Sequence, residues 1–209
     1  MTLELFTAFI IYACVTAITP GPNNMMCLAS GLNYGIKRTL PHIAGIGFGF
    51  AVLVFLAGVG LLSILDYFPA VYHVLRVLSI LYLLYLSWKI ATAAPLSNDA
   101  NKKGKPMGFW QAVAFQWVNP KGLIMAIAAV TNYIPDTPGS AFFFNVVLVS
   151  TAFGVVSFLS SGTWSVFGLT LRRFLNNPRY YRIFNVTMAV LLVLSILPMV
   201  WEMISQAAF

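Results

Sequence analysis

The sequence predicts an all-α membrane protein of six transmembrane helices, built as two inverted three-helix repeats with both termini outside the membrane. Of the 209 residues, 60% are hydrophobic and only 8% are charged, whereas about a quarter of the residues of a soluble domain are charged. The apolar residues form six long runs, and the longest polar stretch divides the chain almost in half. So few charges cannot cover a water-facing surface, so we expect a single domain of residues 1–209 that lies in the lipid bilayer.

Each apolar run is long enough for a helix that crosses the membrane, which takes about 20 residues. The predicted spans are 4–28, 39–63, 69–92, 111–134, 142–168 and 183–205. The polar stretch at about 95–106 is then a linker between a first repeat of about 1–94 and a second of about 107–209. Because each repeat has an odd number of helices, the second is inverted relative to the first, an arrangement that recurs in secondary transporters.

The basic residues indicate which side of the membrane faces the cytoplasm. Nine of the twelve Lys and Arg lie in the links after the first, third and fifth spans: Lys37, Arg38, Lys102, Lys103, Lys105, Arg172, Arg173, Arg179 and Arg182. Links rich in Lys and Arg are cytoplasmic, which makes 95–106 a cytoplasmic linker and leaves both termini outside. The net charge of +7 reflects this topology rather than nucleic-acid binding, for which the sequence contains no motif.

The leading helix of each repeat contains residues that interrupt a regular helix. The first span contains Thr19-Pro20-Gly21-Pro22-Asn23-Asn24, and the fourth contains Trp117-Val118-Asn119-Pro120-Lys121. Proline removes a backbone donor and clashes with the preceding turn. In lipid such a break is tolerated only where it is buried in protein or lines a wet cavity. Either break alone is as well explained by a simple kink, but a pair at matching positions predicts a binding site near the membrane midplane.

The residue types at the two breaks suit a substrate that carries both a carboxylate and an amino group. A helix that restarts after Pro22 presents free backbone N–H groups at a positive dipole end, which attracts an anion. Lys121 costs about 2.5–3.5 kcal/mol near the bilayer centre, so it needs a partner such as a carboxylate. Amide side chains can donate and accept hydrogen bonds. The predicted substrate-binding residues are therefore Pro20, Gly21, Pro22, Asn23, Asn24, Asn119, Pro120 and Lys121.

Other polar and small residues are weaker candidates. Gly45 and Gly49 are more typical of close helix packing than of a pore. His42 can carry a proton, but anchoring at the inner interface is its simpler role. The fifth span contains hydroxyl side chains that either line a polar path or bond their own backbone: Ser157, Ser160, Ser161 and Thr163.

Several functions are disfavoured because their residues are missing. No Asp or Glu lies deep in a predicted span, so no carboxylate is available there to bind a cationic side chain or relay protons. The sequence has no catalytic motif, nucleotide-binding loop or metal-ligand cluster, and we therefore expect no enzymatic activity, cofactor or metal. Cys14 and Cys27 lie thirteen residues apart on one predicted helix, roughly 20 Å, which is too far for a disulfide.

The break residues also resemble the LysE/RhtB superfamily of bacterial amino-acid exporters, in particular threonine/homoserine-exporter-like translocators. The resemblance runs along the whole chain and is carried by Thr19-Pro20-Gly21-Pro22-Asn23 and Asn119-Pro120-Lys121, with support from Gly31, Gly35 and Tyr82–Lys89. It implies that the chain exports an amino acid from the cytoplasm across the bacterial inner membrane, driven by the proton gradient. The missing deep carboxylate favours a neutral amino acid. Lys121 and His42 are then the candidates for proton coupling.

Three alternatives to an exporter remain open. A passive facilitator or channel would show no dependence on the proton gradient. A membrane thiol oxidoreductase would require Cys14 and Cys27 to approach each other. A structural subunit would have no need of paired helix breaks. The chain is small enough to form a homodimer, although no motif specifies one.

Overall fold

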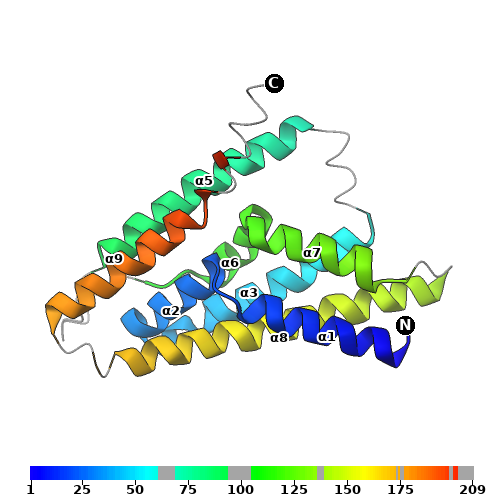
Figure 1. Ribbon diagram of the computed structural model, residues 1–209, viewed down its shortest axis with the longest axis horizontal. Coiled ribbons are helices and arrows are strands. Elements are labelled where there is room, and N and C mark those ends of the chain that lie inside the picture. Colours follow the sequence, from blue (N-terminus) through cyan, green and yellow to red (C-terminus); the bar gives the residue numbers. More distant parts are fainter. Residues whose placement is uncertain are drawn as a thin grey trace.

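The computed structural model describes residues 1–60, 69–93, 105–135, 139–172, 174, 177–197 and 200–201, and of residues 69–73, 75 and 76 it describes only the backbone. Every regular element of these residues is a helix (Figure 1). In chain order they are α1 (Leu3–Ile18), α2 (Pro22–Tyr34), α3 (Ile36–Gly58), α5 (Pro69–Ala91), α6 (Phe109–Phe115), the 3₁₀ helix η3 (Gln116–Val118), α7 (Pro120–Tyr133), α8 (Ser140–Leu171) and α9 (Pro178–Leu194). Lys102, Lys103, Arg173 and most of the predicted linker lie outside the described residues.

The first and fourth predicted spans are each a bent pair of helices. α1 and α2 meet at 56°, and the helical segment Phe109–Val118 meets α7 at 72°. Each pair is apolar and long enough to cross a membrane once, as α3 and α8 are by themselves, which gives up to four candidate spans in the described residues. The helices α5 and α9 overlap the third and sixth predicted spans, and their crossing of the membrane stays a prediction, as do the inverted repeats and the position of the termini.

α8 is central to the body of the molecule, which consists of α1, α2, α3, α6, α7 and α8. It is the longest helix, and it packs along α1, α2 and α3, while α6 and α7 contact α3 from the second half of the chain (Figure 1). α5 and α9 lie side by side as a separate pair and reach the body mainly through α2 and η3. Segments far apart in the sequence therefore surround the two helix breaks.

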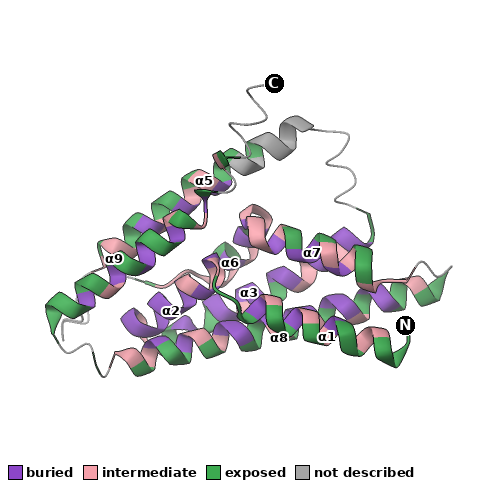
Figure 2. Ribbon diagram, viewed as in Figure 1, coloured by how far each residue is buried: buried purple, intermediate pink, exposed green. Residues whose placement is uncertain are grey.

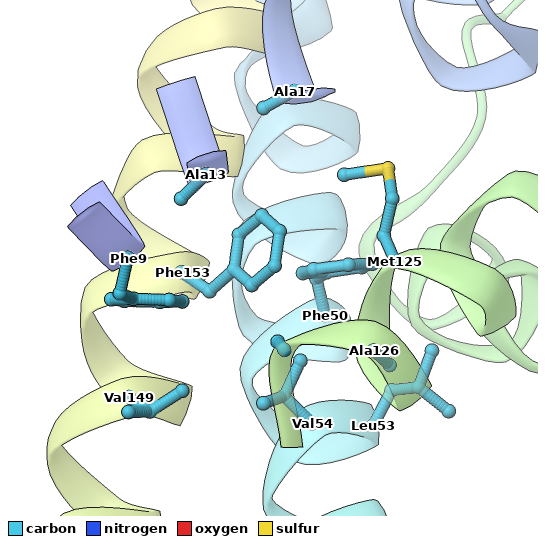
Figure 3. Packing of buried hydrophobic residues seen from close by; sticks show 11 residues of the cluster. Phe9, Ala13, Ala17, Phe50, Leu53, Val54, Met125, Ala126, Val149 and Phe153 are labelled. Atoms are coloured by element: carbon cyan, nitrogen blue, oxygen red, sulfur yellow. The ribbon is translucent and has the colours of Figure 1, made fainter. Parts of the chain in front are cut away.

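The main core lies between α1, α3, α7 and α8 (Figure 3). The ring of Phe153 sits at its centre, 4.7 Å from the ring of Phe50 and 5.6 Å from that of Phe9 between centroids. Exposed residues lie along the outer faces of the helices (Figure 2). Many of them carry large apolar side chains, such as Leu3, which is 80% exposed. An outer surface of this kind suits contact with lipid.

Glycines let several of these helices pack backbone to backbone. A Cβ atom on Gly31 of α2 would clash with the backbone carbonyl of Ser165 on α8, and one on Gly45 would clash with the carbonyl of Phe109 on α6. A Cβ on Gly49 would lie 2.7 Å from the Cα of Val113. The expectation that Gly45 and Gly49 serve close helix packing is therefore confirmed, with α6 as their partner.

Candidate functional site

The first break separates α1 from α2 over three residues. Thr19 and Gly21 are extended, with φ and ψ of −63° and 146° for Thr19 and of −176° and 176° for Gly21. Pro20 prevents α1 from continuing, and Pro22 begins α2 at the position where a missing N–H costs nothing. The end of α1 is thereby left with carbonyl oxygens that have no helical donor.

Neutral side chains cap most of these carbonyl oxygens. The Nδ2 atom of Asn24 donates to the carbonyls of Ala17 at 2.7 Å and Thr19 at 2.8 Å. Two residues of α8 complete the set: Ser160 donates through Oγ to Ala17 at 2.8 Å, and Trp164 donates through Nε1 to the carbonyl of Ile18 at 3.1 Å. Since unpaired backbone groups cost several kcal/mol in lipid, these hydrogen bonds offset much of the free-energy cost of breaking the helix in a membrane.

Lys121 donates to three oxygens of the break, one of which, the carbonyl of Thr19, also accepts from Asn24. Its Nζ atom donates to the carbonyl of Thr19 at 2.7 Å, to the Thr19 hydroxyl at 2.8 Å and to the carbonyl of Pro20 at 3.3 Å. A Cβ atom on Gly21 would lie 2.7 Å from Cδ and 3.2 Å from Nζ of this lysine. The ammonium group therefore joins the two breaks, and glycine at position 21 leaves it the room to do so.

The second break lies at Asn119 and Pro120. Asn119 ends η3 in an extended conformation, and Pro120 begins α7. Among the described residues no side chain caps the N-terminus of α7, and none caps that of α2. The first N–H groups of both helices therefore have no side-chain partner in the part of the chain that the structure describes, and each N-terminus carries partial positive charge.

The two uncapped helix starts line one small cavity, with a volume of about 30 Å³. Six of the eight predicted site residues line it, and Pro20 and Pro120 shape the breaks beside it: the six are Gly21, Pro22, Asn23, Asn24, Asn119 and Lys121. Ile46, Phe50 and Met125 form an apolar wall. The volume suffices for a water molecule or two, so a larger molecule fits only if the surrounding helices move apart. We call the arrangement seen in the structure closed for this reason.

The three predicted amide side chains differ in which of their polar atoms lack a hydrogen-bond partner among the described residues. The Nδ2 atom of Asn24 is engaged by α1, and Asn23 donates through Nδ2 to Oε1 of Gln116 at 2.9 Å. Asn119 is 2% exposed, and its Oδ1 atom has no hydrogen-bond partner among the described residues. A buried acceptor without a donor is unusual, so Asn119 is the amide that is ready to accept a hydrogen bond from a ligand.

His42, the other candidate for proton coupling, is not at this site. It lies on α3 and lines a second cavity with residues of α2 and α5. Its side chain is 1% exposed, so the prediction that it anchors the helix at a membrane interface is wrong. The interpretation failed because its position near the start of a span did not reveal that α2 and α5 cover it.

Some contributors were not identified from the sequence. Gln116 pairs with Asn23, and Trp164 caps α1. The sequence signal that could have revealed Gln116 is a glutamine inside an apolar predicted span, and the structure buries it fully.

The hydroxyl residues of α8 have different roles. Ser157 and Ser161 line the cavity, and Ser160 caps α1. Thr163 is exposed and donates to the carbonyl of Leu159 in its own helix.

The two cysteines, Cys14 and Cys27, are free thiols, the first exposed and the second buried.

Comparison with known proteins gives one consistent picture. Residues 14–196 match the family described as LysE type translocator. The cysteine/O-acetylserine efflux protein of Salmonella typhimurium (strain LT2) is 34% identical over 196 residues, which cover 92% of this chain and 96% of the relative. The protein of the same description from Escherichia coli (strain K12) is 33% identical over the same shares. No solved structure matches this chain significantly.

Proposed function

The chain belongs to the LysE type translocator family, and on that basis we propose that it is a secondary transporter that exports a small, neutral amino acid from the cytoplasm in exchange for protons. The relatives are described as efflux proteins for cysteine and O-acetylserine. Both compounds are small, neutral amino acids, so they are the first substrates to test with this chain.

The observation that carries the proposal is the convergence of two uncapped helix starts and Lys121 on one cavity. Partial positive charge at the N-termini of α2 and α7 and full charge on Lys121 favour an anion at one point. The carboxylate of an amino acid is such an anion. It can accept hydrogen bonds from backbone N–H groups and form a charge-assisted bond with the Nζ atom of Lys121.

The remaining parts of the cavity favour a neutral amino acid. Oδ1 of Asn119 accepts a hydrogen bond from the substrate's amino group, since it has no other partner among the described residues. The substrate's side chain faces Ile46, Phe50 and Met125, with the hydroxyls of Ser157 and Ser161 at one side. No described lining residue is acidic, so a basic side chain would find no counter-charge here.

Lys121 also supplies a mechanism that links binding to movement. In the closed conformation its ammonium group holds the end of α1 through three hydrogen bonds. A bound carboxylate competes with those oxygens for Nζ and thereby loosens the contact between the breaks. α1 and α2 then change their angle about Thr19–Gly21, and α7 changes its angle about Asn119. Such movement about broken helices opens a midplane site to one side of the membrane at a time.

We assign proton coupling to Lys121 rather than His42. Lys121 lies in the cavity that the substrate occupies, whereas His42 lies in another cavity. A proton on Nζ strengthens carboxylate binding, and loss of that proton weakens it. Among the described lining residues, Lys121 is therefore the titratable group of this cavity whose protonation state affects substrate binding.

In the proposed membrane arrangement the chain crosses the bilayer six times. α5 and α9 complete the set of six spans in the bacterial inner membrane, with the segments rich in Lys and Arg in the cytoplasm. The breaks of the first and fourth spans then lie at equivalent depths of two inverted repeats.

Counterflow in proteoliposomes tests the function. Vesicles that contain the purified chain are loaded with unlabelled O-acetylserine, cysteine, threonine, leucine or lysine, and uptake of the labelled compound is followed with and without a pH gradient. We expect uptake of a small, neutral amino acid that responds to the gradient. Uptake without any response would indicate a passive facilitator, and uptake of lysine alone would contradict the assignment of a neutral substrate.

A further inference from the structure

A second cavity lies between α2, α3, α5 and the segment that precedes α6. Its volume is about 120 Å³, four times that of the cavity at the breaks. The residues that line it include His42, Asn33, Lys89 and Lys105. The basic residues around it lie on the side that the sequence predicts to be cytoplasmic.

The side chain of His42 lines this cavity and has no hydrogen-bond partner among the described residues. The side chain is 1% exposed, and neither ring nitrogen has a hydrogen-bond partner among the described residues. Imidazole always offers at least one N–H donor, and when neutral it also offers an acceptor. Buried polar atoms are normally paired, so both nitrogens are available to a polar molecule in the cavity.

Asn33 is held in a fixed orientation beside His42 by α9. The hydroxyl of Tyr181 donates to Oδ1 of Asn33, and Nδ2 of Asn33 donates to Oδ1 of Asn185 at 3.2 Å. An amide nitrogen carries two hydrogens, so among the described residues one N–H of Asn33 remains for a ligand. Tyr181 and Asn185 therefore fix the orientation of the Asn33 amide at the cavity.

The charge of the cavity favours an anionic group. Lys89 of α5 and Lys105 lie at its rim, and none of its described lining residues is acidic. The Nζ atom of Lys89 lies 5.6 Å from the centroid of the Tyr85 ring, which holds the charge at the wall. Like charges above a low-dielectric wall raise the local concentration of anions.

α2 connects this cavity to the site at the breaks. Asn23 lies at one cavity and Asn33 at the other, and ten helical residues correspond to about 15 Å. Asn23 pairs with Gln116 at the first cavity, and Met26, which lines the second cavity, belongs to one packed cluster with Phe115. The two cavities therefore lie along one helix, with packed or hydrogen-bonded side chains at each of them.

We propose that the second cavity is an inner binding site for the transported amino acid, occupied before it reaches the helix breaks. The carboxylate binds Lys89 and Lys105, and the amino group donates to the free imidazole nitrogen of His42, while Asn33 donates its spare N–H. This inference rests on the proposed function, since it takes its ligand from the transport reaction.

Equilibrium binding in nanodiscs tests the inner site. The probe is radiolabelled O-acetylserine or cysteine, whichever the wild-type chain exchanges in counterflow. Lys121→Ala disables the site at the breaks, so the binding that remains reports the second cavity. We expect this variant to retain binding, and we expect Lys89→Ala with Lys105→Ala in the same background to weaken it at least about tenfold, as loss of charge-assisted bonds should. His42→Gln should weaken it too, whereas Lys37→Ala, at an exposed position outside the cavity, should not.

The outcomes separate this inference from the proposed function. If the wild-type chain binds and exchanges the probe but Lys121→Ala binds none, the inner site does not exist and the proposed function stands. Residual binding that survives both the double lysine variant and His42→Gln places the ligand elsewhere and also overturns the inference. If the wild-type chain exchanges none of the neutral amino acids used in counterflow and binds neither probe, both proposals fail.

Discussion

At Lys121 the chain places an ammonium group among the carbonyl oxygens that the broken first helix leaves without backbone donors. Two roles meet in this one side chain. It stabilises the closed break, and it is the cation that a carboxylate would displace from those oxygens. A lysine within a membrane-spanning segment is energetically unfavourable, and the half-buried Lys121 has the oxygens of the break as its partners.

Gly21→Ala tests whether the position of this ammonium group matters. The added methyl group would press on Cδ and Nζ of Lys121, so the end of the lysine side chain must shift, and we expect it to lose bonds to the Thr19 and Pro20 oxygens. We expect a chain that inserts normally but exchanges its substrate at least about tenfold more slowly, the equivalent of about 1.4 kcal/mol. Gly162→Ala is the matched control, because a methyl group there meets open space. Normal counterflow by Gly21→Ala would show that the lysine contact is dispensable.

Asn119 provides a second test at the scale of single residues. If its free Oδ1 atom accepts a hydrogen bond from the substrate's ammonium group, Asn119→Ala removes a bond worth about 1.5–3 kcal/mol. We therefore expect the substrate concentration for half-maximal exchange to rise roughly tenfold or more. Asn132→Ala, near the end of α7, controls for loss of an amide, since Asn132 is exposed and, among the described residues, its side chain donates to Ala128 and Thr131 of its own helix. An unchanged half-maximal concentration for Asn119→Ala would remove this contact from the site.

At the scale of helices, the arrangement depends on how closely α2 approaches α8. Gly31 and Ser165 are in backbone contact, as are Gly168 and Leu28. This contact places the start of α2 beside Ser157 and Ser161, which line the same cavity. The break can bend only if the helices on either side of it are held, and α8 holds both α1 and α2.

Gly31→Ala tests this close approach. The new methyl group would meet the rigid backbone of Ser165, so the helices must separate, which typically costs 1–3 kcal/mol. We expect a lower midpoint of thermal unfolding in detergent, with loss of transport in proportion to loss of folded protein. Gly162→Ala on α8 should leave the midpoint unchanged. Equal midpoints for the two variants would show that α2 and α8 are not tightly packed at Gly31.

The sequence predicted where the helices break better than it predicted which residues pack against the breaks. Proline acts locally, so Pro20, Pro22 and Pro120 show where a helix must stop whatever packs around it. The partners of the break come from tertiary packing. Gln116, Ser160 and Trp164 reach it from η3 and α8, and nothing in their local pattern specifies that approach. The burial of His42 was missed for the same reason, because α2 and α5 cover it.

At the scale of the whole molecule, charge distribution predicts an orientation. Basic residues flank the ends of α2, α5 and α8, so these ends should face the cytoplasm and both termini the outside. We expect a thiol reagent that cannot cross membranes to label intact cells when cysteine replaces Thr2, and to label only opened cells when cysteine replaces Lys37, both in a Cys14→Ser, Cys27→Ser background. The reverse pattern would contradict this orientation and would place the second cavity near the outer side of the membrane.

The central claim is that an amino acid binds where the two broken helices meet, through Lys121. The measurement that tests it most directly is counterflow by Lys121→Ala beside wild-type chain and Lys37→Ala, at equal amounts of inserted protein. The account predicts that Lys121→Ala loses exchange of the small, neutral amino acid while Lys37→Ala, which changes an exposed lysine, retains it. Exchange by Lys121→Ala at the wild-type rate and half-maximal concentration would contradict the account and place the substrate elsewhere.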